Sequence, residues 1–424
     1  MVGPPAARQP RAHSASSTLV TTADASDRPT PLSTPVSAGI VASLVGFTSS
    51  FAVVLTGLRA VGASPTEAAS GLSALCLTQA LGMMWLARRY RQPITLAWST
   101  PGAALLAGTG VVVGGWPAAV GAFVTVGVLI VLTGLWPTLG AIVSKIPIPL
   151  AQAMLAGVLL PLCSAPVVAF AESPTRIAPV VIVWLVVLRF SARWAVPAAF
   201  AAAAAIIAAD VISRGTPIAG AELIPRVDWT IPQWSWQATI GIAVPLYIVT
   251  MASQNIPGTT VMASFGFRIP WRASMAVTGT GTVLGAFAGG HTINLAAISA
   301  ALSANPAAHP DPTRRWTAAF TAGCSYLVLA LLATALATLV AAAPAGVVET
   351  VAGLALLGTL AASLFGALEH ASDREATVLT FLVAASGLTF AGIGSAFWAL
   401  AVGLVVRAVL RRQSPTPTDT RATD

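Results

Sequence analysis

Residues 286–301 read AFAGGHTINLAAISAA, and they place polar side chains where the chain is otherwise apolar for long stretches. His291, Thr292 and Asn294 follow the pair Gly289-Gly290, after which a run of small residues resumes. Polar groups within a hydrophobic segment are costly to bury and commonly mark a binding or transport site. This stretch is the strongest indication in the sequence of where a functional site lies.

The composition of the chain indicates a membrane protein. Of its 424 residues, 56% are hydrophobic and only 8% are charged, whereas soluble domains carry about a quarter charged residues. So few charged side chains cannot cover a surface in water. The apolar residues form long runs of Ala, Val, Leu and Gly, without the alternation over about ten residues that is typical of a transmembrane β-strand. We therefore expect an all-α polytopic membrane protein.

Apolar stretches that are long enough to cross the hydrocarbon core recur along the chain. We predict about fourteen transmembrane segments, at residues 36–58, 66–87, 97–112, 118–139, 149–169, 177–190, 194–213, 237–256, 271–288, 293–304, 317–342, 346–366, 374–390 and 393–410. The longest internal loop, residues 214–236, separates seven segments in 35–213 from seven in 237–411. The polar ends, residues 1–34 and 412–424, are predicted to be disordered tails.

The basic residues predict the orientation. With fourteen crossings, both tails lie on one side of the membrane together with eighteen of the 22 Lys and Arg residues. The other four are Arg59, Arg176, Arg214 and Arg226. Cytoplasmic loops carry an excess of basic residues, so both termini are predicted to be cytoplasmic and the 214–236 linker extracytoplasmic. The basic residues are scattered between apolar segments, unlike the clustered basic face of a nucleic-acid-binding protein.

The third and tenth predicted segments are both interrupted. Residues 92–110 read QPITLAWSTPGAALLAGTG, where Pro101-Gly102 disturbs any helix. The tenth segment, residues 293–304, is also short. Interrupted segments at matching positions of two halves indicate the binding site of a secondary transporter. We expect each to combine a short extended strand with a half-helix, the second starting at Thr292 and Asn294, and the N–H groups at such helix starts favour an anion.

Polar and aromatic residues in and near the interrupted segments are the candidates for binding a substrate. Tyr247 and Gln254 are seven residues apart and therefore share one face of a helix. An amide in a membrane helix needs a cavity or another helix to bond with. The predicted substrate-binding residues are Thr95, Trp98, Ser99, Thr100, Tyr247, Gln254, Asn255, Thr292 and Asn294.

Several of these residues have a structural alternative. Thr292 and Asn294 would equally well bond the free N–H groups at a helix start, and Gln254 would equally well join two helices. Trp98 either forms an aromatic wall for the substrate or anchors its segment at the membrane interface. His291 is the only histidine predicted at membrane depth, and it either carries a coupling proton or caps the half-helix.

No sequence feature indicates an enzyme or a metal site. Cys76, Cys163 and Cys324 each stand alone in an apolar segment, without the spacing of a disulfide framework or a zinc site. The chain lacks the HExxH, GxSxG and Walker-type GxxxxGKS or GxxxxGKT motifs. We therefore expect a membrane protein that is not an enzyme, binds no metal or cofactor, and draws on an ion gradient for uphill transport.

Five stretches of the sequence resemble the benzoate membrane transport (BenE) family of benzoate–proton symporters. They are SAGIVASLVGFTSSFAVVL, PITLAWSTPGAALL, SQNIPG, GGHTINLAAISAAL and HPDPTRRWTAAFTAG. The resemblance extends from about residue 32 to about residue 412, and AWSTPGAALL and HTINLAAI are its most specific motifs.

This resemblance implies a fold related to that of the nucleobase–proton symporters, such as the uracil transporter. In that fold, fourteen spans form two inverted seven-span repeats, and spans 3 and 10 pair as short strands at the binding site. The resemblance also implies a core domain of spans 1–4 and 8–11 and a gate domain of spans 5–7 and 12–14. Related folds often form homodimers through the gate domain.

The resemblance further implies an inner-membrane symporter that imports benzoate, or a similar aromatic carboxylate, with a proton. Nucleobase symporters carry glutamates in spans 8 and 10, where this chain offers Gln254, Asn255 and Asn294. The lack of a fixed carboxylate suits an anionic substrate and leaves His291 as the predicted proton carrier. A symporter for a nucleobase or another small aromatic compound, and an uncoupled channel or facilitator, are the alternatives.

Overall fold

A computed structural model describes residues 33–136, 138, 140, 146–215, 220–369 and 373–411, together with Gly3. All the elements below belong to the unit Leu32–Asp424. The predicted tails, residues 1–34 and 412–424, lie outside the described residues, except for Gly3 and for the first helix, which begins at Ser33.

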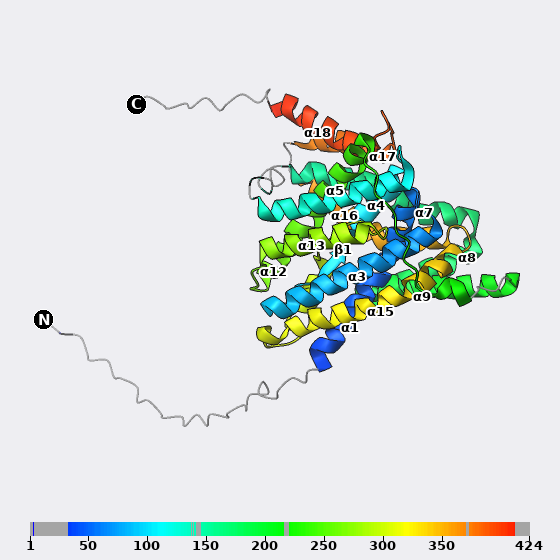
Figure 1. The fold of residues 1–424 in the computed structure, drawn as a ribbon, viewed down its shortest axis with the longest axis horizontal. Helices are drawn as coiled ribbons and strands as arrows, with labels where there is room; N and C mark the ends of the chain where they lie inside the picture. The colour runs from blue at the N-terminus through cyan, green and yellow to red at the C-terminus, as the bar shows by residue number, and fades with distance from the viewer. Residues whose placement is uncertain are drawn as a thin grey trace. The chain divides into compact units, whose positions relative to one another are not determined.

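The first half of the chain is helical apart from one short strand (Figure 1). In chain order its elements are α1 (Ser33–Thr48), α2 (Phe51–Ala60), α3 (Pro65–Tyr90), β1 (Leu96–Trp98), α4 (Thr100–Thr109), α5 (Gly115–Leu135), α7 (Ile148–Glu172), α8 (Pro174–Phe190) and α9 (Ala192–Arg214). The helix start at α3 is specified locally. Ser64 accepts a hydrogen bond from the backbone N–H of Glu67, whose carboxylate accepts one from the N–H of Ser64, and Pro65 occupies the first turn.

The second half also contains one short strand among helices. Its elements are η1 (Gly220–Leu223), α10 (Trp236–Ala238), η2 (Thr239–Ala243), α11 (Val244–Thr250), η3 (Met251–Asn255), α12 (Ile256–Ser264), α13 (Trp271–Ala286), β2 (Ile293–Leu295), α14 (Ile298–Ala304), η4 (Pro312–Arg314), α15 (Trp316–Ala341), α16 (Val347–Leu368), α17 (Arg374–Ala385) and α18 (Ser395–Arg411). The turns η2 and η3 are π-helical, whereas η1 and η4 are 3-10 turns.

Eight helical stretches among the described residues are long and apolar enough to cross a membrane. They are Thr34–Ala60, Pro65–Tyr90, Gly115–Leu135, Ile148–Glu172, Ala192–Arg214, Trp236–Ser264, Pro312–Ala341 and Val347–Leu368. The remaining predicted segments coincide with the shorter helices α4, α8, α13, α14, α17 and α18. The structure thus confirms the all-α polytopic class.

The eighth predicted segment is longer than expected. Its end was predicted at residue 256, but the helix continues through Pro257 to Ser264. The π-helical turn Met251–Asn255 directly precedes the proline. A wide turn changes the backbone hydrogen-bond register, and Pro257 then lies in the first turn of α12, where its missing N–H costs little.

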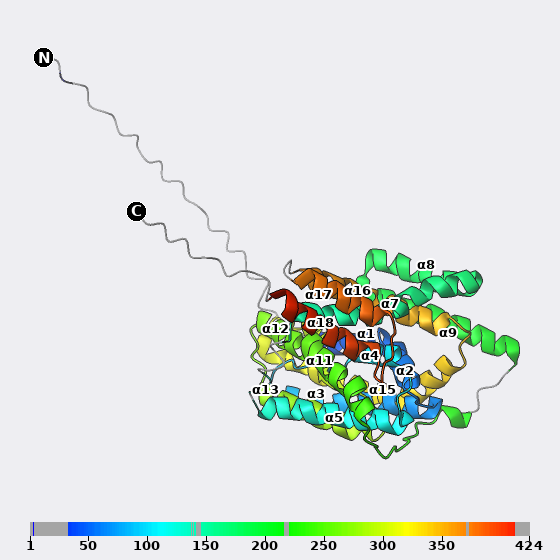
Figure 2. The same ribbon diagram turned by 90° about the horizontal axis from the view of Figure 1, so that it is seen from above.

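The helices pack in two groups. In the first, α3 lies against α15 and α13, α5 lies against α13, and α1 lies against α15. In the second, α7 lies against α16 and α17, α17 lies against α18, and α8 lies against α9. Figures 1 and 2 both show α3 beside α15. The first group therefore contains the helices that contact the two strands, α3 beside β1 and α13 beside β2.

Glycines allow the helices of the first group to approach closely. A methyl group at Gly279 of α13 would lie 2.6 Å from the carbonyl oxygen of Gly127 in α5, and one at Gly127 would lie 2.8 Å from the carbonyl oxygen of Gly279. Contacts between small residues of this kind hold membrane helices together, because lipid offers no hydrophobic drive for their association.

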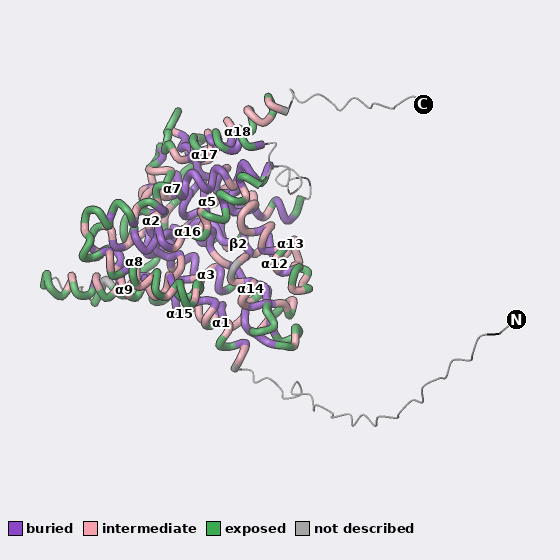
Figure 3. The backbone as a smooth tube through the Cα atoms, turned by 180° about the vertical axis from the view of Figure 1, so that it is seen from behind, coloured by how far each residue is buried: buried purple, intermediate pink, exposed green. Residues whose placement is uncertain are grey.

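The outer faces of α8 and α9 are largely exposed (Figure 3). In α8 the only buried residues are Ile177 and Val180, while Ile182, Leu185 and Phe190 are more than half exposed. Exposed apolar side chains along a helix of this length are expected for a surface in contact with lipid.

Candidate functional site

The two interrupted segments meet in a short antiparallel ribbon. Ala97 of β1 pairs with Asn294 of β2, and Trp98 pairs with Ile293. Because side chains alternate between the faces of a strand, the polar and apolar residues separate. The polar face carries Thr95, Ser99, Thr292 and Asn294, and the apolar face carries Leu96, Trp98, Ile293 and Leu295. Four predicted site residues from distant parts of the sequence thus share one face.

A cluster of three hydroxyl groups lies at the start of α4. Ser99 is the N-cap of this helix, and its Oγ accepts a hydrogen bond from the N–H of Gly102 at 3.1 Å. The hydroxyl of Thr250, in α11, donates to Ser99 Oγ at 3.0 Å and lies 3.3 Å from the hydroxyl of Thr292. We call Ser99, Thr250 and Thr292 the hydroxyl cluster; all three side chains are fully buried. It joins both interrupted segments to the eighth segment.

Two side chains bond the outer edge of β2. The N–H of Ile293 donates to Thr282 Oγ1 at 3.1 Å, and the N–H of Leu295 donates to Asn255 Oδ1 at 2.9 Å. The other amide atom of Asn255 lies 3.2 Å from the sulfur of Met251. Strand edges within a membrane protein need such partners, because unsatisfied backbone groups are costly there. Asn255 therefore supports the ribbon.

The polar face of the ribbon also has atoms that remain open to a further hydrogen bond. Among the described residues, Thr95 Oγ1 and Asn294 Oδ1 have no hydrogen-bond partner, although both side chains are buried. The Nδ2 group of Asn294 donates to the carbonyl oxygen of Leu295 at 2.8 Å. Buried polar atoms are nearly always bonded in native proteins, so Thr95 and Asn294 are candidates for contact with a bound molecule.

Trp98 lies on the opposite face of the ribbon. Its indole N–H donates to Ser50 Oγ at 2.9 Å. The ring packs edge-on against Phe47 and Tyr326, with centroids 5.6 and 6.0 Å away. Trp98 is therefore packed within the helices, away from the hydroxyl cluster, and belongs neither to the wall of that cluster nor to the membrane interface.

The predicted start of the second half-helix was wrong. Strand-like bonding continues past β2, since the N–H of Ala296 donates to the carbonyl oxygen of Thr95 at 3.0 Å, and α14 begins only at Ile298. Thr292 and Asn294 thus lie beside and within the ribbon. His291 precedes β2 and does not cap α14.

His291 is fully buried beside α5. Its ring packs edge-on against Phe123 of α5, with centroids 6.5 Å apart. Neither ring nitrogen has a hydrogen-bond partner among the described residues. The preceding Gly290 lies against Leu75 of α3. His291 is thus a buried imidazole that makes no hydrogen bond to the hydroxyl cluster.

The remaining predicted residues differ in how deeply they are buried. Tyr247 is buried, and its hydroxyl is hydrogen-bonded to that of Thr133 in α5. Gln254 is half-buried in the π-helical turn η3, and such turns are frequent at functional sites. Thr100 is the first residue of α4 and is also half-buried.

Sequence reasoning missed three buried polar residues. Thr250 follows Tyr247 by three positions and precedes Gln254 by four, so helical spacing would have placed it on their shared face. Thr282 carried no such signal, because its role depends on where β2 lies. Gln79 of α3 is fully buried, and neither of its amide atoms has a partner among the described residues.

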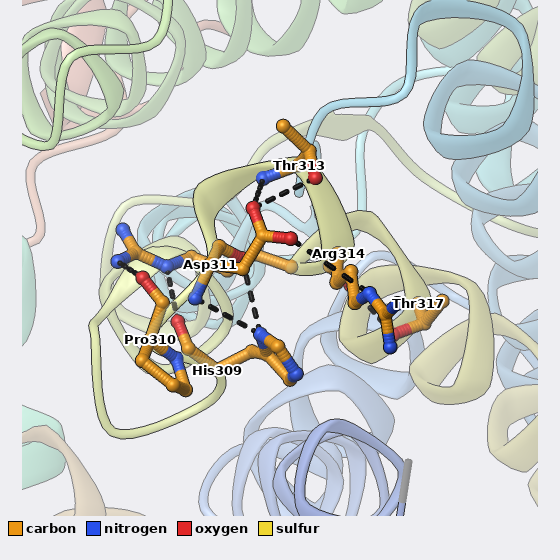
Figure 4. A network of polar contacts seen from close by, with 7 residues as sticks. His309, Pro310, Asp311, Thr313, Arg314 and Thr317 are labelled. Carbon is orange, nitrogen blue, oxygen red and sulfur yellow. Dashed lines mark hydrogen bonds and ion pairs between the residues drawn. The ribbon is translucent and has the colours of Figure 1, made fainter. Parts of the chain in front are cut away.

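An arginine holds the chain that follows α14. The buried guanidinium of Arg315 donates to the carbonyl oxygens of Ala304, His309 and Pro310 at 2.8, 2.7 and 3.1 Å. Ala304 is the last residue of α14, so a cation stabilises the helix end where carbonyls are unpaired. Figure 4 shows Asp311 in the same turn.

Asp311 orders that turn through local bonds. Its carboxylate accepts hydrogen bonds from the hydroxyl and the backbone N–H of Thr313, at 2.7 and 2.8 Å. These two bonds lower the pKa of Asp311 below its ordinary value. The N–H of Asp311 donates to His309 Nδ1 at 3.0 Å. Hydrogen bonds therefore hold this turn in one conformation directly after the second half-helix.

Potential metal ligands do not gather in the part of the chain that the structure describes. No group of three His, Cys, Asp or Glu side chains there is placed to hold an ion. The polar face of the ribbon offers only hydroxyl and amide groups, which suit an organic ligand with a polar head.

Two interrupted segments that pair inside a polytopic helical protein define a membrane transporter. Similar solved structures have this fold. The transmembrane domain of the bicarbonate transporter BicA of a cyanobacterium gives a TM-score of 0.56 at 15% identity, covering 89% of this chain and 97% of that one. SLC26A9 gives 0.61 at 14% identity, covering 90% and 65%.

The chain belongs to the BenE family, whose model, described as benzoate membrane transport protein, matches residues 29–409. It is 37% identical over 375 residues to the inner membrane protein YdcO of Escherichia coli, covering 88% of this chain and 95% of that protein. It is 27% identical over 378 residues to the benzoate membrane transport protein of Acinetobacter baylyi, covering 88% and 94%. The resemblance seen in the sequence is confirmed: the chain is a transporter of this family and not an enzyme.

Proposed function

We propose that this protein is a proton-coupled secondary transporter that imports benzoate, or a similar aromatic carboxylate, across the inner membrane. The observation that carries the proposal is the ribbon, which collects Thr95, Ser99, Thr292 and Asn294 on one buried face at the start of α4. Family membership and the relative named as a benzoate membrane transport protein support the choice of substrate.

The polar face provides neutral donors and acceptors for a carboxyl group. The hydroxyl cluster and the backbone at the start of α4 donate hydrogen bonds to a carboxylate. The open acceptor, Asn294 Oδ1, receives the O–H of the protonated acid. No fixed carboxylate stands on this face to repel the anion. Tyr247 of α11, which is buried beside the cluster's Thr250, is the aromatic residue that we assign to the substrate ring, with Gln254 and Thr100 at the edge of the site.

His291 is the residue that we assign to proton coupling. It is a fully buried imidazole at the end of the ribbon, and neither ring nitrogen has a hydrogen-bond partner among the described residues, so its basic nitrogen is open to a proton. Imidazole is the side chain whose charge changes most readily near neutral pH. Transfer of the substrate as its neutral acid is the other route by which the same gradient is used.

The two groups of helices supply the moving parts. In this proposal the fourteen segments form two inverted repeats, residues 35–213 and 237–411, joined by an extracytoplasmic linker at 214–236, with both termini in the cytoplasm. The group containing α3, α5, α13 and α15 is the core domain of spans 1–4 and 8–11. The group containing α7, α16, α17 and α18 is the gate domain of spans 5–7 and 12–14, and it provides the surface for a homodimer.

The test is uptake of labelled benzoate by proteoliposomes under an imposed pH gradient. We expect accumulation that a protonophore abolishes, and competition by salicylate but not by uracil. Accumulation that survives the protonophore indicates an uncoupled facilitator, and competition by uracil indicates a nucleobase symporter.

Variants test the assignment of the site. Asn294→Ala and Gln254→Ala are expected to abolish uptake while the protein remains inserted in the membrane. Ser264→Ala is the matched control, because Ser264 is exposed and bonds only to a carbonyl of its own helix. Normal uptake by both site variants would contradict the assignment.

A further inference from the structure

A cavity of about 520 Å³ lies between the two groups of helices, away from the ribbon. Leu55 and Arg59 of α2 line it together with Val340 of α15 on one side, and Val348 and Glu349 of α16 line it on the other. Its volume is within the range of roughly 300–1,000 Å³ that is typical of sites for small molecules. It is at the end of the helices that is predicted to face away from the cytoplasm.

Arg59 is the cationic group of this cavity. In the described part of the chain its guanidinium has no carboxylate within ion-pair distance, whereas Arg176 and Arg214, which are predicted on the same side, both pair with Asp210. Glu349 is the acidic residue of the lining, and its Oε2 accepts a hydrogen bond from the N–H of Gly346 at 3.1 Å. Glu349 is thereby engaged at the start of α16, and Arg59 is left for another anion.

A second cavity of about 310 Å³ shares Ala341 with the first and is lined by Arg226 of the linker. Across the two adjoining cavities, two guanidinium groups accompany one carboxylate. The remaining lining side chains are mostly alanine, proline, valine and leucine, together with four threonines. An unpaired cation beside apolar walls matches a small molecule with an anionic head and an apolar body.

Aromatic rings lie along α2 next to the residues that line the larger cavity. Phe51 lies one helical turn below Leu55 in α2 and is fully buried. Its ring stacks on Phe47 at 5.1 Å and meets Phe200 of α9 edge-on at 4.7 Å. Phe47 in turn contacts Trp98 of the ribbon. These rings form a chain of contacts from α2, which lines the cavity, to Trp98 of the ribbon.

We propose that the cavity is an outer receiving site for the aromatic carboxylate, in which Arg59 binds the carboxylate and the contact of Phe51 with Phe200 separates it from the ribbon. The choice of ligand rests on the proposed function. The attraction of anions to this cavity does not depend on the proposed function, because it follows from the unpaired guanidinium of Arg59. One experiment therefore tests the cavity without benzoate, and a second one tests it with benzoate.

The first experiment measures the charge preference of the cavity with thiol reagents. Ala345→Cys introduces a cysteine on its exposed wall, in a Cys324→Ala background, since Cys76 and Cys163 are buried. The reagents are an anionic and a cationic methanethiosulfonate of similar size. The control cysteine is Gln233→Cys, on the exposed linker.

Relative to this control, we expect Ala345→Cys to favour the anionic reagent by about sevenfold at low ionic strength, because one charge at roughly 7 Å in water speeds the anionic reagent and slows the cationic one by nearly threefold each. Adding Arg59→Gln removes that preference, and adding Glu349→Gln increases it. Equal preference at both cysteines, or no change with Arg59→Gln, would overturn the proposal.

The second experiment measures benzoate uptake kinetics. Arg59→Gln is expected to raise KM by about threefold with kcat little changed, as for a charge that acts on capture, and Glu349→Gln is expected to lower KM. Arg59→Lys is expected to have a KM close to that of the wild type, because lysine keeps the positive charge. An unchanged KM in Arg59→Gln would refute carboxylate binding at this residue. If wild-type protein takes up no benzoate while the thiol preference holds, the proposed substrate fails and the cavity stands as an anion site.

Discussion

The backbone N–H of Ser99 donates to the carbonyl oxygen of Thr292 at 2.9 Å. This bond ties the N-cap of α4 to the residue that precedes β2, although the two residues are far apart in the chain. Thr250 bonds to both side chains. The first interrupted segment, the second one and the eighth segment therefore meet at one point. A substitution that moves one of these three residues is expected to shift the other two.

Thr250→Val tests that meeting point. Valine keeps the shape of threonine but removes the hydroxyl that bonds Ser99 and Thr292. Loss of these two buried hydrogen bonds, each of about 0.5–1.5 kcal/mol, is expected to lower kcat/KM for uptake roughly tenfold or more. Thr260→Val is the control, because Thr260 is exposed and bonds only to its own helix. Equal uptake by the two variants would show that the hydroxyl cluster does not contribute.

Asn255 and Asn294 are expected to differ in what they support. Asn255→Ala leaves the N–H of Leu295 without its acceptor, so the free energy of unfolding should fall by about 1–3 kcal/mol and the melting temperature with it. Asn294→Ala should impair uptake with a smaller change in melting temperature. Thermal unfolding in detergent and uptake in vesicles, measured on both variants, check this. The reverse pattern would exchange the two roles.

Gly71 lies where α3 passes the turn before the ribbon. A methyl group there would be 2.4 Å from the carbonyl oxygen of Gly289, which has a φ of 87° and is itself restricted to glycine. Gly71→Ala is therefore expected to destabilise the protein by about 1–3 kcal/mol. Gly358→Ala is the control, since a methyl group there meets nothing within 4 Å. A melting temperature unchanged by Gly71→Ala would mean that the ribbon moves freely relative to α3.

Arg315 is expected to stabilise the turn after α14. Arg315→Met removes three hydrogen bonds to the carbonyl oxygens of Ala304, His309 and Pro310 and should cost about 2–4 kcal/mol of folding stability. Arg314→Met is the matched control, because Arg314 is exposed and has only a 3.7 Å contact with Asp311. Similar melting temperatures for both variants would count against the role of Arg315.

His291 is tested through the driving force of uptake. His291→Ala and His291→Gln both remove the titrating group, and glutamine retains a polar side chain. Both variants are expected to lose accumulation driven by a pH gradient while still exchanging labelled for unlabelled benzoate. Accumulation that depends on the gradient as in the wild type would leave the neutral acid as the proton carrier.

Local properties of the sequence were sufficient for the class of fold and for the interrupted segments. Span length and apolar composition predict membrane helices, because a backbone in lipid must satisfy its hydrogen bonds within its own segment. Pro101-Gly102 and Gly289-Gly290 predicted the two breaks, because proline lacks a backbone N–H and glycine adopts conformations that interrupt a helix. The pattern also identified Thr95, Ser99, Thr292 and Asn294, which the structure gathers on one face.

Only the tertiary structure decided which way each side chain faces and what it bonds. Strand register turned Trp98 toward Ser50 and Phe47, and it placed Asn255 opposite the free N–H of Leu295. A shift of one residue in a two-stranded ribbon exchanges its faces, and no single segment contains that information. The roles of Thr250, Thr282 and the unpaired Arg59 likewise depend on which helices are neighbours. The sequence by itself determined which two segments are broken, and the packing of distant helices decided where the second half-helix begins and which side chains the breaks present.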